Sequence, residues 1–197
     1  MEAVRTQGQE AAEDIFFGQL VLIWARWFII VGAALLLLLT SDTVDELIVA
    51  TIFVVVLMGI NFFIHGRYML ERPANRVLLS IMSILDVVVV TLVVSAWGDQ
   101  SGLNSPYFIF YFPVVLAFAF VFEPRQSIVF TLLASGAYFG VAIYLDAGIL
   151  TNSLELEILV TRIIALASVG GLATYYWRIQ RNRRRDLIMN FANPENA

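Results

Sequence analysis

Six long apolar stretches alternate with five short polar connections along this chain. The apolar stretches are residues 20–40, 47–65, 77–97, 107–122, 127–145 and 156–177. A helix needs about 20 apolar residues to cross the hydrocarbon core of a bilayer, and a backbone in lipid must satisfy its hydrogen bonds within its own segment. The pattern therefore predicts an all-α polytopic membrane protein, a bundle of six transmembrane helices, rather than a barrel of short alternating strands.

The basic residues predict how this bundle is oriented. The chain has no lysine, and its arginines outside the apolar stretches lie mainly in the second connection, in the fourth connection and after the sixth stretch: Arg67, Arg72, Arg76, Arg125, Arg178, Arg181, Arg183, Arg184 and Arg185. The first, third and fifth connections hold no basic residue. Because short arginine-bearing loops stay in the cytoplasm, we expect both termini there. Residues 1–19 and 178–197 are then cytoplasmic tails, the second one basic, around a membrane domain at 20–177.

Composition excludes several classes of protein. A chain with 60% hydrophobic and 14% charged residues has too much apolar surface for a soluble domain of this size. It has no cysteine, which excludes a disulfide framework and thiolate ligands. It also lacks a glycine-rich phosphate loop, an HExxH motif and a serine elbow. The lone His65 is a poor basis for a metal or haem site. We therefore expect no enzyme, no metal and no nucleic-acid partner, with membrane lipids as the surroundings.

Ionisable residues inside the apolar stretches are candidate functional residues, because charge at membrane depth is costly. Asp86 lies ten residues beyond Arg76, which at 1.5 Å per residue places it roughly 15 Å deep, near the midplane. We expect Asp86 to pair with Arg162 in the sixth stretch, and with Arg26 in the first as the second choice. The alternative role for such a pair is to fix helix register only.

Arg26 has a second interpretation of its own. It is flanked by Trp24 and Trp27, a pattern typical of an anchor whose charged head reaches the inner membrane interface.

Small residues at four-residue spacing predict close helix packing in lipid. Gly136 and Gly140 form such a pair in the fifth stretch. The sixth stretch has two more small pairs, Ala167 with Gly171 and Gly170 with Thr174. We expect these faces to pack within the bundle, with dimerisation as the alternative.

The third connection and the residues after it form a candidate ligand site. The connection is rich in Gly, Asn, Ser and Pro, which favour turns, and a dense aromatic segment follows it. Hydrogen-bonding groups beside aromatic walls are suited to a flat amphipathic molecule such as a quinone, and ordinary lipid-facing aromatics are the alternative. The fourth stretch, which starts here, contains Pro113, and we expect a kink at that position.

Two segments carry a family resemblance. Residues 85–94, with an aspartate in an apolar run, and residues 102–108, Gly-Leu-Asn-Ser-Pro-Tyr-Phe, resemble the N-terminal six-span membrane input domain of bacterial sensor histidine kinases, of the RegB-like redox sensor type. The resemblance implies quinone binding near the outer face, at Gly102, Asn104, Pro106 and Tyr107. The sequence departs from the family's Gly-Gly-x-x-Asn-Pro-Phe turn, since Ser101 replaces a glycine and Ser105 separates Asn104 from Pro106.

The resemblance implies a function of the same kind. We expect a sensor-like input module for signal transduction in the bacterial cytoplasmic (inner) membrane, without its own catalytic domain and self-associating as a homodimer. The alternative is a non-catalytic structural subunit of a larger respiratory or photosynthetic membrane complex, bound to other membrane-protein subunits. A small transporter is least favoured, because the sequence has no internal repeat of interrupted helices.

Overall fold

The computed structural model describes residues 7–40, 44–70, 75–96 and 101–192, and the described part of the chain is helical without any strand. Its helices are α1 (Gln7–Thr40), α2 (Val44–Met69), α3 (Arg76–Ala96), α4 (Tyr111–Val121), α5 (Pro124–Leu145) and α6 (Ser153–Ala192). Three short 3₁₀ helices lie between them, η1 (Gly102–Asn104), η2 (Pro106–Phe110) and η3 (Ala147–Leu150). Arg72 and Trp97, which belonged to the expected loop and span pattern, lie outside the described residues.

In the part of the chain that the structure describes, four helices are long and apolar enough to cross a membrane, over Gly18–Leu36, Arg76–Ser95, Pro124–Leu145 and Ser153–Arg183. Two further apolar helical segments are shorter, Val54–Met69 and Pro106–Val121. Large apolar side chains such as Phe28, Phe63 and Leu132 are exposed, as expected where lipid replaces water as the solvent. The expectation of an all-α membrane protein is confirmed at this level.

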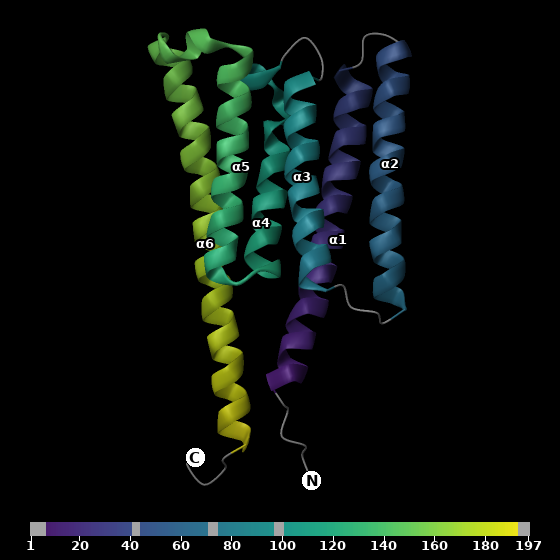
Figure 1. The fold of residues 1–197 in the computed structure, drawn as a ribbon, viewed down its shortest axis with the longest axis vertical. Coiled ribbons are helices and arrows are strands. Elements are labelled where there is room, and N and C mark those ends of the chain that lie inside the picture. The colour runs from purple at the N-terminus through teal and green to yellow at the C-terminus, as the bar shows by residue number, and fades with distance from the viewer. Residues whose placement is uncertain (1–6, 41–43, 71–74, 97–100, 193–197) are drawn as a thin grey trace.

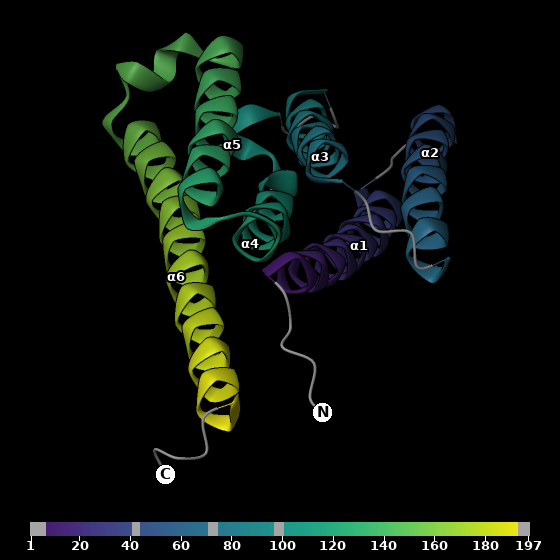
Figure 2. The ribbon, with the colours of Figure 1, turned by 60° about the horizontal axis from the view of Figure 1, so that its bottom comes forward.

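Helix α4 lies at the centre of the bundle. It packs against α1, α3, α5 and α6, whereas α2 lies at the edge and packs mainly against α1 (Figures 1 and 2). The side chains at its centre are fully or almost fully buried, among them Val115, Phe118 and Tyr111. Because α4 packs against four other helices, a displacement of α4 would disturb contacts on every side of the bundle.

The fourth stretch differs from the expectation of one kinked span. Residues 106–110 form the 3₁₀ helix η2, and α4 then begins at Tyr111. Pro113 is therefore the third residue of α4. Its missing N–H is one that an α-helix leaves unbonded in its first turn, so Pro113 is compatible with the start of α4.

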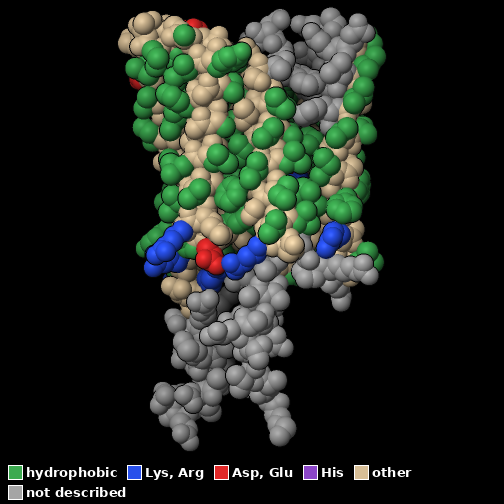
Figure 3. Space-filling model, in the orientation of Figure 1, with side chains coloured by type: hydrophobic (Ala, Val, Ile, Leu, Met, Phe, Trp, Pro, Cys, Tyr) green, Lys and Arg blue, Asp and Glu red, His purple; other side chains and the backbone are tan. Residues whose placement is uncertain are grey.

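Arginine side chains gather at one end of the bundle. On the face in Figure 3 they form a band at the lower end of the helices, below a surface that is mostly hydrophobic. Arg76 begins α3, Arg125 lies in the first turn of α5, and both are exposed. Arg76 Nη1 donates to Glu123 Oε1 at 3.0 Å. In Figure 1, α3 and α5 start at the end from which α6 projects beyond the bundle. Arg76 and Arg125, from two different connections, thus lie at the same end of the bundle, as the sequence predicted for them.

The glycines that make close helix contacts are not the ones expected. A Cβ on Gly136, Gly140 or Gly171 would meet no atom within 4 Å, leaving aside each helix's own backbone, so these three face outward. The prediction that they pack inside the bundle is wrong for the single chain. Gly170 makes the close approach instead, since a Cβ there would lie 2.6 Å from Thr131 Cγ2 and 2.9 Å from Val115 Cγ1. Helices α4, α5 and α6 meet at this point.

Gly170→Ala should therefore lower the free energy of unfolding by about 1–3 kcal/mol, the usual cost of overpacking a close contact. The matched control is Gly171→Ala, the next residue on the same helix, which has open space and should gain up to about 1 kcal/mol of helix propensity. Reversible denaturant unfolding in detergent micelles measures both. Equal stabilities for the two variants would contradict the close approach of α6 to α4 and α5.

Candidate functional site

Two charged side chains meet inside the bundle, Arg26 of α1 and Asp86 of α3. Arg26 Nε donates to Asp86 Oδ1 at 2.8 Å and to Oδ2 at 3.0 Å, and Arg26 Nη2 donates to the carbonyl oxygen of Met82 at 2.9 Å. Their side chains are only 6% and 10% exposed. The carboxylate thus receives a charge-assisted hydrogen bond at a depth where an unpaired charge would be costly.

This geometry corrects two expectations. The favoured partner of Asp86, Arg162, is engaged elsewhere, and the second choice, Arg26, is the partner found. Arg26 is also not an interfacial anchor, because its head turns into the bundle rather than toward the membrane surface. The choice was decided by helix order in space, since α1 lies near α3 whereas α5 separates α3 from α6 (Figure 1).

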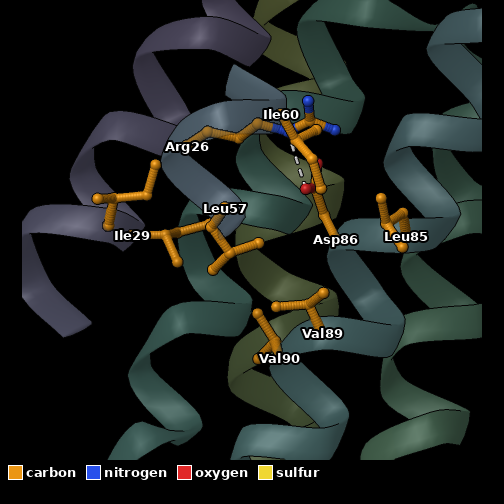
Figure 4. Close-up of a pocket in the computed structure, with 9 residues that line it drawn as sticks. Arg26, Ile29, Leu57, Ile60, Leu85, Asp86, Val89 and Val90 are labelled. Atoms are coloured by element: carbon orange, nitrogen blue, oxygen red, sulfur yellow. Dashed lines mark hydrogen bonds and ion pairs between the residues drawn. The ribbon is translucent and has the colours of Figure 1, made fainter. Parts of the chain in front are cut away.

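The ion pair lies at a cavity between α1, α2 and α3. Figure 4 shows Ile29 from α1, Leu57 and Ile60 from α2, and Val89 and Val90 from α3 around it. The space is about 20 Å³, near the size of one water molecule, and its walls are mainly apolar. It is too small for a drug-sized ligand.

Further polar groups are buried near the pair. Asn61 Nδ2 donates to the carbonyl oxygen of Ile23 at 3.3 Å, and Gln19 Nε2 donates to that of Ile64 at 3.2 Å. Among the described residues, Arg26 Nη1, Asn61 Oδ1 and Ser83 Oγ are buried without a hydrogen-bond partner. The sequence analysis did not single out Gln19 and Ser83, although polar residues inside apolar stretches were the available signal.

Arg162 belongs to an aromatic and polar network in the half of the bundle away from the arginine band. Its Nη1 donates to the hydroxyl of Tyr138 at 2.9 Å, and its guanidinium carbon lies 4.7 Å from the ring centre of Phe108. The rings of Tyr138 and Tyr111 are 5.7 Å apart, and the Tyr111 hydroxyl shares a 2.6 Å hydrogen bond with Thr91 of α3. This network connects α6 to α3 through α5 and α4.

The four residues expected to bind a ligand do not converge. Gly102 and Asn104 line a cavity of about 250 Å³, but Tyr107 is 2% exposed within the core and Pro106 is exposed outside the cavity. Gly102 has φ +61°, and a Cβ there would meet Leu145 Cδ1 at 3.2 Å, which explains a glycine at this turn. Among the described residues, no aromatic side chain lines this cavity, although aromatic walls were part of the quinone expectation.

The other wall of this cavity comes from distant parts of the chain. Asp146 and Ile149 contribute from the end of α5 and from η3, and Glu155 from the first turn of α6. Asp146 Oδ1 accepts a hydrogen bond from the backbone N–H of Gly148 at 2.8 Å. The cavity is therefore polar and acidic. It lies at the end of the bundle opposite the arginine band, which we refer to as the outer end.

His65 is half-buried in α2, with its ring edge-on to Tyr68 at 6.4 Å between centroids. The described residues contain no group of three His, Cys, Asp or Glu side chains able to hold a metal ion.

Comparison with known proteins adds no relative. No family model, no curated protein and no solved structure matches this chain.

Asp86→Asn should lower the free energy of unfolding by about 3–5 kcal/mol, because it leaves the Arg26 guanidinium buried and uncompensated. Adding Arg26→Gln should recover part of that loss, so the two effects are strongly non-additive. As the control, Arg162→Gln combined with Asp86→Asn should be additive, since the two side chains share no partner. Denaturant unfolding of the three single and two double variants in micelles, beside the wild type, gives the two coupling energies. Additive losses at Arg26 and Asp86 would contradict the pairing.

Proposed function

We propose that this protein is a sensor-like input module of the membrane, which takes a ligand near the outer end and transmits a shift through α6. One observation carries the proposal: α6 is a single helix of 40 residues that begins beside the outer cavity and continues beyond the bundle at the opposite end (Figure 1). A continuous helix connects its ends mechanically, as transmission across a membrane requires.

Contacts along α6 support this proposal. Glu155 lines the outer cavity, and two turns on Arg162 bonds Tyr138 and contacts Phe108. Further along, the hydroxyl of Thr174 shares a 2.8 Å hydrogen bond with Ser127 of α5. Helix α6 is therefore bonded to α5 at two positions along its length, so a displacement of α6 at Glu155 would also move the contacts with α5. At 1.5 Å per residue, the distance from Glu155 to Asn182 in the projecting part is about 40 Å.

The topology is part of the proposal. We infer six spans with both termini in the cytoplasm of a bacterial inner membrane, and with the outer cavity on the opposite side. The support is the shared position of Arg76 and Arg125 at one end of the bundle, together with the rule that short arginine-bearing loops stay inside.

A second candidate function has an observation in its favour. Gly136, Gly140 and Gly171 face away from the bundle with open space before them, and outward glycine pairs in lipid are typical of contacts between chains. A structural subunit of a larger respiratory or photosynthetic complex would cover such faces with other chains, and a homodimer would cover them with its own copy. Quinone binding near the outer face also remains a prediction of the family resemblance.

Signal transmission is testable because the chain has no cysteine, so Asn182→Cys gives a single spin label on the projecting part of α6. Glu155→Gln removes charge at the outer cavity and should change the label's spectrum in lipid. The matched control, Glu157→Gln, alters an exposed carboxylate outside the cavity and should leave it unchanged. An unaltered spectrum for Glu155→Gln would contradict transmission, and constant co-purification with a respiratory complex would then favour the structural subunit.

The proposed topology has its own test. A single cysteine at Arg125 should react with a membrane-impermeant maleimide only after the cytoplasmic side is opened, whereas one at Thr151 should react in intact cells. Labelling of position 125 from outside would overturn the orientation.

A further inference from the structure

The outer cavity is large enough for a small solute and is built by segments far apart in sequence. Its volume is about 250 Å³, and its walls come from η1, the end of α5, η3 and the first turn of α6. Residues 101–104 contribute one wall, whereas Asp146 and Glu155 contribute from the opposite part of the chain. The site is therefore a product of the tertiary fold rather than of one loop.

The charge of the walls sets the charge of the occupant. Asp146 and Glu155 are both carboxylates, and none of the described residues that line the cavity is basic. Glu155 is half-buried, and among the described residues it has no ion pair or hydrogen bond. The nearest arginine along α6, Arg162, is turned to Tyr138 and Phe108 instead. A cleft lined by one sign of charge raises the local concentration of the opposite ion.

Local helix chemistry accounts for only part of these carboxylates. Asp146 caps η3 through its Oδ1, which bonds the N–H of Gly148. At the start of α6 the side-chain acceptor is Asn152, whose Oδ1 bonds the N–H of Leu154 at 3.2 Å, so the helix does not need Glu155 as a cap. The first turn of α6 favours a carboxylate through the helix dipole, and the Glu155 carboxylate at the same time lines the cavity, where it can meet a cation.

The other residues that line the cavity indicate which groups, besides positive charge, the ligand should carry. The hydroxyl of Ser101 and the side-chain oxygen of Asn104 can accept hydrogen bonds from N–H groups. Leu103, Leu145 and Ile149 supply apolar surface between the polar groups. The described residues contain no group of three His, Cys, Asp or Glu side chains able to hold a metal ion, whereas ammonium groups joined by a short methylene chain match both the polar and the apolar walls.

We infer that the outer cavity binds a small organic cation, of the class of short aliphatic amines, between Asp146 and Glu155. The inference deepens the proposed function, because it names the chemical class of ligand that the sensor-like module would take at its outer end.

The test is isothermal titration of the intact protein in phosphatidylcholine nanodiscs, with 1,4-diaminobutane as the probe. Saturable binding is expected, and 1,4-butanediol, which has the same length without charge, should not bind. Glu155→Gln and Asp146→Asn should each weaken binding by about tenfold or more, which is about 1.4 kcal/mol. Asp146→Asn keeps an oxygen for the Gly148 N–H, and the matched control Glu157→Gln should bind as the wild type does.

Three results would overturn the inference: no saturable binding to the folded protein, equal binding by Glu155→Gln, or equal binding of the diol. Tighter binding of MgCl₂ at the same two carboxylates would also overturn it in favour of an inorganic cation. The spin label at position 182 separates this inference from the proposed function. Amine binding without a spectral change keeps the amine site and rejects the sensor, and a spectral change in Glu155→Gln without amine binding does the reverse.

Discussion

A charge inside a membrane must be matched, and the ion pair between Arg26 and Asp86 meets this constraint. The pair joins α1 to α3 across a cavity that α2 closes from a third side. Either side chain alone would be a buried charge in a low-dielectric interior, so each requires the other. The positions of α1 and α3 relative to each other are therefore fixed by electrostatics as well as by packing through α4.

Close approach at the centre of the bundle is the second constraint. Lipid provides no hydrophobic drive between helices, so helices in a membrane associate through contact and hydrogen bonds. Gly170 lets α6 touch α4 and α5, and nearby hydroxyl groups of Ser127 and Thr174 add a hydrogen bond between α5 and α6. The half of the molecule that contains α4, α5 and α6 is thus held tightly. The cavity at the outer end is partly lined by α6, which is held against α4 and α5 along the bundle.

The two polar sites differ in what they can do. The pair of Arg26 and Asp86 is neutral overall and encloses only about 20 Å³, which suits a structural or register role. The outer cavity is about 250 Å³, and the described part of its wall contains two carboxylates and no basic side chain, which suits an exchangeable cation. The buried ion pair and the charged cavity are separate sites. This agrees with a module that binds a ligand at the outer end while the ion pair keeps the helices together in the middle of the bundle.

The sequence by itself indicated that lipid surrounds this protein and that Arg76 and Arg125 lie at one end of the bundle, because apolar length and charge position act locally along the chain. It also placed Asp86 within an apolar helix and Gly102 at a turn. Only the tertiary structure decided that Asp86 meets Arg26 rather than Arg162, since both arginines can pair with a carboxylate and helix order in space makes the choice. The tertiary structure also decided that Gly136 faces outward and that Asn104 and Glu155 line the same cavity. The spacing of small residues defines a face of a helix, and the composition of a loop defines a turn. Which residues pack against that face or turn depends on which helix the fold places opposite.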